Sequence, residues 1–227
     1  MKRLSGSLIV LVFAGGVSAA PFQNGSFEFG PPNPCNTFNV GAGSTIITGW
    51  TVSVGNIDWE SAPGCGWQPS NGSNSLDLVG SSAGGIGGIQ QTFDTVPGVT
   101  YQVSFDLSGN YGAALVIKPL AVTINGVTTN YTFDTTGRGQ FNMGWTPKVQ
   151  TFVAAGSSST INFVSDVSGS GGTLNAGAAL DNVQIVPFGA AGPGVAVPLD
   201  WAHMGATALI LLAGMAYFTR RRLRARR

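Results

Sequence analysis

The chain has 227 residues and a formal net charge of +1, and 9% of its residues are charged. The charge is uneven: residues 21–196 carry three cationic and nine acidic side chains, a net of −6, whereas six arginines stand among residues 220–227. The acidic stretch excludes nucleic-acid binding, which depends on Lys and Arg to neutralise phosphates. Neutral partners and cations remain open.

The N-terminus has the parts of a secretory signal peptide. Lys2 and Arg3 precede the short apolar run 8–14, and small residues follow at 17–19. This order is typical of a cleaved export signal. The apolar run is well short of the ~20 residues that a membrane span needs, which makes an uncleaved anchor the weaker alternative. We expect residues 1–20 to be a signal peptide.

The C-terminus ends in an apolar segment followed by arginines. Residues 204–218 carry no charge, and Trp201 and Tyr217 stand near the two ends of the segment, where interfacial aromatic residues occur. An arginine cluster stays on the cytoplasmic side because its passage through the bilayer is costly. The alternative is an amphipathic or buried C-terminal helix. We expect, in chain order, a Gly/Ala/Pro linker, a transmembrane sorting or anchor helix and a cytoplasmic Arg cluster, at 188–198, 199–219 and 220–227.

Short strand patterns fill the segment 21–187. Residues 99–107 alternate apolar and polar side chains, which indicates a half-buried strand. Asn125-Gly126 between two further alternating runs predicts a β-hairpin with a type I′ turn. Many short strands separated by turns predict one all-β sandwich. The expected strands are 45–54, 56–60, 75–79, 88–93, 99–107, 121–124, 127–133, 149–154, 160–165 and 179–186.

Two cysteines, Cys35 and Cys65, lie in the expected exported domain. An even number of cysteines outside the cytoplasm favours a disulfide, and a loop of about 30 residues closed in this way would stabilise the fold by about 3–4 kcal/mol. Two buried free thiols are the alternative.

An ordered set of short motifs resembles a known family. The set resembles the choice-of-anchor C family of bacterial surface proteins, and related plant cell-wall proteins, over about residues 22–187. This resemblance implies a galactose-binding-like jelly roll, the fold of many carbohydrate-binding modules. The motifs are Asn24–Glu28, Gly49-Trp50, Ile57–Glu60, Leu76–Leu78, Gly88–Phe93, Val96–Gly98, Tyr101–Phe105 and Ala179–Val183.

The tail resembles the exosortase-type sorting signals of Gram-negative bacteria, which combine a Val-Pro-containing motif, an apolar helix and an Arg cluster. It lacks the Pro-Glu-Pro of the best-known class. The resemblance implies a sorting protease as a partner, and a domain in the periplasm on an inner-membrane anchor, or at the cell surface or outside the cell after processing. The residues that carry it are Val197, Pro198, Trp201, Arg220, Arg221 and Arg222.

Catalytic chemistry has little support in the sequence. His203 is the one histidine and lies in the anchor segment, which excludes a His-based triad or zinc site in the exported domain. Asp58 and Glu60 stand two apart on an expected strand and so share a face, as a glycosidase pair would. We favour two solvated acids there, with Trp59 facing the core, and expect no catalytic residue.

Sugar recognition would use aromatic faces beside short polar groups. Trp50 and Trp59 fall inside strand patterns and are expected in the core. The candidates for ligand binding are therefore Trp67, Trp145, Tyr111 and Tyr131. For Trp67 and Trp145, packing within their loops is an equal alternative.

The jelly-roll resemblance also implies a structural calcium ion. By position, Glu28 near the first strand and Asp181 in the last strand would hold it. Carboxylate oxygens suit this hard cation. The alternative is that both are surface acids.

Taken together, the sequence predicts an exported, non-enzymatic surface protein that binds polysaccharide in the envelope or extracellular matrix. The alternatives are a structural or adhesive matrix protein without a defined sugar ligand and, as the weakest, a glycoside hydrolase.

Overall fold

The computed structural model describes residues 20–32, 37–61, 66–81, 84–113, 115–170 and 175–189. Within these ranges no helix is long and apolar enough to cross a membrane. The predicted signal peptide and anchor helix lie outside the described residues. The elements are β1 (Thr37–Gly41), β2 (Thr51–Ser61), β3 (Asn74–Asp77), β4 (Ile86–Asp94), β5 (Thr100–Gly109), β6 (Ile117–Ile124), β7 (Val127–Asp134), β8 (Thr146–Val153), β9 (Ser158–Asp166), the 3-10 helix η1 (Ser168–Ser170) and β10 (Ala178–Pro187).

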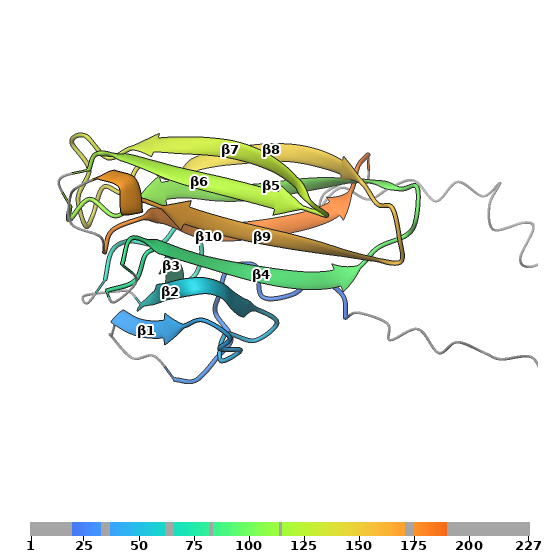
Figure 1. Ribbon diagram of the computed structural model, residues 1–227, viewed down its shortest axis with the longest axis horizontal. Helices are drawn as coiled ribbons and strands as arrows, with labels where there is room; N and C mark the ends of the chain where they lie inside the picture. Colours follow the sequence, from blue (N-terminus) through green and yellow to red (C-terminus); the bar gives the residue numbers. More distant parts are fainter. Residues whose placement is uncertain are drawn as a thin grey trace, which may run out of the picture. The chain divides into compact units, whose positions relative to one another are not determined.

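The strands form a curled antiparallel sheet in the order β7-β6-β9-β4-β2-β3-β10-β5-β8, with β1 paired to β2. The sheet turns on itself at β2, which pairs with β4 before Gly55 and with β1 and β3 after it. Gly55 has a φ of 58°, a conformation that glycine adopts without steric cost. The result is two facing layers, one with β1, β3, β10, β5 and β8 and the other with β4, β9, β6 and β7 (Figure 1).

The inner faces of the two layers form one hydrophobic core. Alternate residues of β5 and β9 are buried, as the period-2 pattern predicts. Phe105 of β5 meets Phe163 of β9 edge to face, with 5.3 Å between the ring centroids. Trp50 and Trp59 are 1% and 2% exposed, and full burial of a large apolar side chain contributes about 1.5–3 kcal/mol. The predicted all-β sandwich and the two core tryptophans are confirmed.

The predicted hairpin is also confirmed. Asn125 and Gly126 both have positive φ angles, of 48° and 84°, between β6 and β7. The strand predicted over 45–54 is partly wrong, because Trp50 N–H donates to Ile47 O and closes a turn just before β2 begins at Thr51. β1 was not predicted, since it has five residues and only one of them is buried.

Two of the motifs meet in an N-terminal corner. The side-chain nitrogen of Asn24 donates to the carbonyl oxygens of Phe29 and Thr48, at 2.9 and 2.8 Å. Trp50 Nε1 donates to Asn24 O at 2.9 Å. The Asn24–Glu28 and Gly49-Trp50 motifs are therefore parts of one structural corner rather than a ligand site.

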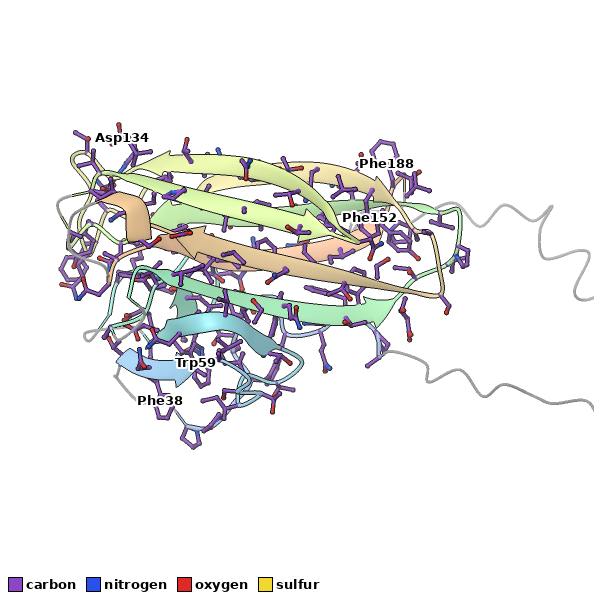
Figure 2. The ribbon with its side chains drawn as sticks, in the orientation of Figure 1. Phe38, Trp59, Asp134, Phe152 and Phe188 are labelled. Atoms are coloured by element: carbon purple, nitrogen blue, oxygen red, sulfur yellow. The ribbon has the colours of Figure 1, made fainter. Side chains whose placement is uncertain are left out.

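Both ends of the described domain leave from the same end of the sandwich. Ala20 O accepts from Asp94 N–H, and Phe188 N–H donates to Thr100 O, where a short turn joins β4 to β5. Figure 2 shows Phe188 at this end and Asp134 at the opposite end. We call the end with Phe188 the terminal end and the end with Asp134 the far end.

Candidate functional site

Acidic side chains gather on the outer face of β2 and β3, towards the far end. The antiparallel register places Asp58 opposite Asp77, and Glu60 follows Asp58 on the same face. Trp59 between them faces the core and donates from Nε1 to Phe27 O at 3.0 Å. The expectation of solvated acids is wrong: Asp58, Glu60 and Asp77 are 4%, 6% and 0% exposed. Loops cover this face.

One covering loop carries Trp67. Its ring packs with Met143, Ala179 and Trp145 in a small cluster separate from the main core. Its Nε1 donates to Ser75 Oγ of β3 at 2.8 Å. Trp67 is therefore 6% exposed, and it acts first as the packing that closes this face.

A second loop, residues 135–145, crosses the first. Gln140 Nε2 donates to Gly66 O at 2.6 Å, and Gln140 O accepts from Gln68 N–H at 2.9 Å. Trp145 Nε1 donates to Gln68 O at 2.9 Å. These bonds tie the two loops together across more than 70 positions of sequence.

A polar pocket opens beside the crossing loops. Its volume is about 330 Å³, at the lower end of the ~300–1,000 Å³ of small-molecule sites. Tyr111, 38% exposed, forms part of its wall. The pocket contains an aromatic face, amides and a carboxylate, and these are groups that can bind a hydroxylated ring. It is lined by Glu60, Gly66, Trp67, Asn110, Tyr111, Gly112 and Gln140.

Glu60 is the acid that lines this pocket. Thr37 Oγ1 donates to its Oε2 at 2.9 Å. Burial raises the pKa of Glu60 to about 7, and the nearby Asp58 adds to the increase while the Thr37 bond opposes it. Glu60 therefore changes its charge near neutral pH.

Asp77 lies beneath the pocket and is fully buried. Its Oδ1 accepts from the amides of Val79 and Gly177, both at 2.9 Å, and its Oδ2 accepts from Asn110 Nδ2 at 2.6 Å. Burial raises the pKa of Asp77 to about 7 in spite of these bonds. Because Asn110 also lines the pocket, Asp77 positions one of its walls.

Asp58 does not offer a free oxygen to a substrate. Its Oδ1 accepts from Asn39 Nδ2 at 2.6 Å, and its Oδ2 accepts from the amide and hydroxyl of Ser81 at 3.0 and 2.6 Å. A glycosidase pair needs both carboxylates at the scissile bond. The structure gives Asp58 a structural task instead.

Three of the four aromatic candidates lie at or beside the pocket, and one does not. Trp67 and Tyr111 line the pocket, and Trp145 packs on Trp67 without lining it. Tyr131 lies elsewhere: it projects from β7, contacts Phe105 edge to face at 5.3 Å and donates to Gln150 Oε1 at 3.0 Å. Tyr131 thus joins the two layers and is not part of this pocket.

Glu28 and Asp181 both hold the loop 70–74. Asp181 Oδ2 accepts from the amides of Ser70 and Asn71, each at 2.8 Å, and its Oδ1 accepts from Asn182 N–H. Glu28 Oε1 accepts from the amides at 73 and 74, and its Oε2 from the side-chain amide at 74.

The calcium ion expected at these two acids stays a prediction, and their hydrogen bonds do not favour it. Every oxygen of Glu28 and Asp181 already accepts at least one hydrogen bond, and calcium takes six to eight oxygen ligands. No group of three or more His, Cys, Asp or Glu in the described part of the chain could hold a metal ion. The two acids stabilise a loop.

Several predicted residues lie outside the described residues, so their predictions stay open. They are Cys35 and Cys65 of the expected disulfide and Val197, Pro198, Trp201, Arg220, Arg221 and Arg222 of the expected sorting signal.

Apart from its two glycines, three residues of the pocket were not predicted as ligand contacts. Glu60 was considered only as half of a catalytic pair, and Asn110 and Gln140 carried no sequence signal. Their one available hint is local: Asn110 and Tyr111 directly follow the clearest predicted strand, where loops of sandwiches carry function.

The fold and this pocket define a β-sandwich domain with a polar site at one end. The chain belongs to the DUF642 family, which is described as a protein of unknown function and matches residues 20–186. It is also 35% identical over 213 residues to halomucin of Haloquadratum walsbyi, an alignment that covers 84% of this chain. The chain spans only 2% of the length of halomucin.

Solved structures with a distant likeness include carbohydrate-binding modules. TmCBM61 in complex with β-1,4-galactotriose is 16% identical, covering 75% of this chain and 99% of that one, with a TM-score of 0.44. A family 35 module from Clostridium thermocellum is 11% identical, covering 66% and 98%, with a TM-score of 0.42.

Proposed function

We propose that this protein is an exported, non-enzymatic surface protein whose sandwich binds polysaccharide through the pocket at its far end. The observation that carries the proposal is the pocket itself. It sets the rings of Trp67 and Tyr111 beside the amides of Asn110 and Gln140 and the carboxyl of Glu60. Rings stack on the C–H faces of sugars while amides and carboxylates bind the hydroxyls.

The size of the pocket favours a single sugar residue. At about 330 Å³ it has room for one ring rather than a long oligosaccharide. It also opens near the far end, whereas residues 20 and 188 are at the terminal end. A glycan chain could therefore present its terminal residue to the pocket without meeting either end of the described domain.

The hydrogen bonds of the acids support binding rather than hydrolysis. Both carboxylate oxygens of Asp58 accept hydrogen bonds, from Asn39 and from Ser81. Glu60 therefore has no second carboxylate beside it that is free to act on a substrate. A lone acid in a pocket can bind a hydroxyl, but the usual hydrolytic mechanism needs two.

Export and anchoring rest on the sequence alone. The segments 1–20 and 199–227 support a route through the inner membrane, with the domain retained on an anchor or released to the surface by a sorting protease. Intact-mass measurement of the protein from membrane and medium tests this route: export requires loss of residues 1–20, and an intact N-terminus on cytosolic protein contradicts it.

A glycan array tests the binding function. We expect the full chain, in a detergent without sugar groups, to bind at least one class of polysaccharide fragment. Trp67→Phe replaces the indole with a smaller aromatic ring and removes the Nε1 bond to Ser75, and serves as a mild variant of the wall. If no glycan binds to the folded protein, the structural or adhesive alternative replaces this proposal.

A further inference from the structure

Resting on the proposed function, we propose that Glu60 makes the pocket selective for neutral sugar residues over uronic acids. The proposal assigns a ligand class to the pocket and a specificity role to one residue.

Glu60 has one carboxylate oxygen left for a ligand. Its Oε2 accepts from Thr37 Oγ1, and among the described residues no donor reaches its Oε1. The side chain is 6% exposed, and the surface it shows lines the pocket. A sugar hydroxyl could donate a hydrogen bond to Oε1. Because a nearly buried acceptor is costly to leave without a donor, this oxygen discriminates strongly between ligands.

The surroundings of Glu60 are negative. Asp58 stands two residues before it on the same face of β2, Asp77 of β3 lies opposite Asp58, and Tyr111 also lines the pocket. Among the described residues no lysine or arginine lines the pocket. A ligand carboxylate would therefore meet the charge of Glu60 without a cation in the described pocket wall to compensate it.

The three cations of the described chain are engaged or distant. Lys118 of β6 is fully buried, donates from Nζ to Ala176 O at 3.0 Å and interacts electrostatically with Asp77. Arg138 lies over the ring of Phe133 at 5.8 Å, and Lys148 stands in the middle of β8. None of the three contributes to the pocket wall.

The selectivity should depend on pH. Glu60 is ionised above about 7, where it accepts from a neutral hydroxyl and repels a uronate. Below that pH the protonated acid loses most of this repulsion. Asp77, which is not among the lining residues, changes charge over the same range.

Matched sugar pairs test the proposal. The probes are oligosaccharides that end in galactose or galacturonic acid and in glucose or glucuronic acid, measured with the full chain at pH 8 and pH 5. We expect the neutral member of the bound pair to bind at least about tenfold more tightly at pH 8, which corresponds to about 1.4 kcal/mol. The ratio should fall by at least about threefold at pH 5.

Glu60→Gln keeps the size and the acceptor but removes the charge. In this variant the ratio of the affinities for the neutral sugar and for its uronic acid should approach one and lose its pH dependence. The neutral sugar should still bind. Asp94→Asn removes the same charge at the terminal end and should keep the wild-type ratio. A thermal scan of each variant shows that it is folded.

The outcomes separate the two proposals. If wild-type protein binds a neutral sugar and its uronate equally, or prefers the uronate, the selectivity proposal is overturned and the binding function stands. If Glu60→Gln keeps the affinity ratio of the wild type, the selectivity proposal is likewise overturned and the binding function stands. If no probe or array glycan binds, both proposals fail. Should Glu60→Gln not fold, the pH series of the wild type decides.

Discussion

Gly25 and Val183 lie backbone to backbone where the N-terminal corner meets β10. Val183 N–H donates to Gly25 O at 2.8 Å, and a Cβ on Gly25 would stand 1.8 Å from Val183 O. Asn182, just before Val183, has a positive φ of 51° at the bulge of β10. The first and last motifs of the chain are thus two halves of one contact, which closes the sandwich.

Gly25→Ala should destabilise the domain severely. The new methyl group would overlap backbone rather than a flexible side chain, so the corner or β10 must shift. We expect a loss of at least about 3 kcal/mol in the free energy of unfolding. Gly41→Ala is the matched control, because a Cβ there meets nothing within 4 Å. Chemical denaturation of both variants measures the difference, and equal stabilities would contradict this account of the corner.

Stability should fall as the pH rises from mild acid to neutrality. Asp77 binds its proton more tightly in the folded state, where burial raises its pKa from an ordinary value of 3.8 to about 7. Its contribution is therefore complete below about pH 4 and is lost as the pH rises towards 7. Glu60 and Asp181, whose pKa values are also raised to about 7, act in the same sense.

Asp77→Asn should flatten this pH dependence by several degrees of Tm, because each kcal/mol moves the Tm by about 2–4 °C in a domain of this size. Asp134→Asn is a control of opposite sign, since hydrogen bonds to Thr136 lower the pKa of that exposed acid. Thermal melts of the three proteins from pH 4 to pH 8 measure the slopes. A wild-type Tm that rises steadily over this range is incompatible with the prediction.

Two tyrosines should separate binding from stability. Tyr111→Ala removes an exposed wall of the pocket, and we expect at least about tenfold weaker glycan binding with the Tm nearly unchanged. Tyr131→Ala removes the contact with Phe105 and the bond to Gln150, so the Tm should fall by several degrees while the folded protein still binds. If Tyr131→Ala weakened glycan binding and Tyr111→Ala lowered only the Tm, the binding site would not be this pocket.

Calcium should not stabilise the domain. Glu28 and Asp181 already bind the amides of the loop 70–74, and an ion would have to displace those bonds. We expect Tm values in millimolar calcium and in EDTA to agree within about 1 °C, because only a ligand of the native state shifts the Tm. A clear calcium-dependent increase would restore the metal site that the jelly-roll resemblance implies.

Much of the fold could be predicted from the sequence because period 2 and turn residues are local signals. The hairpin at Asn125-Gly126 and the strand that contains Phe105 are examples. The boundaries that differ are also local in origin: the turn at Trp50 shortens an apparently continuous strand, and β1 is too short and exposed to show a pattern.

The pocket could be predicted only in part. Trp67 and Tyr111 stand among turn residues, which points to loops at one end of a sandwich. The environment of Glu60 depends on Thr37, on Gly66 and on the distant loop with Gln140, so no local pattern reveals its burial. Glu60 has the sequence pattern of a surface acid, but its burial under these loops raises its pKa to about 7.

The central claim is that the far-end pocket, and no other surface, receives the glycan. It is tested most directly by titrating the 15N-labelled protein with the tightest-binding array glycan and following the amide and indole resonances. We predict that the Trp67 indole and the backbone amides of Gly66 and Gly112 shift first and saturate together. Shifts concentrated between β7 and β8, or on the outer face of β6 and β9, would contradict the claim.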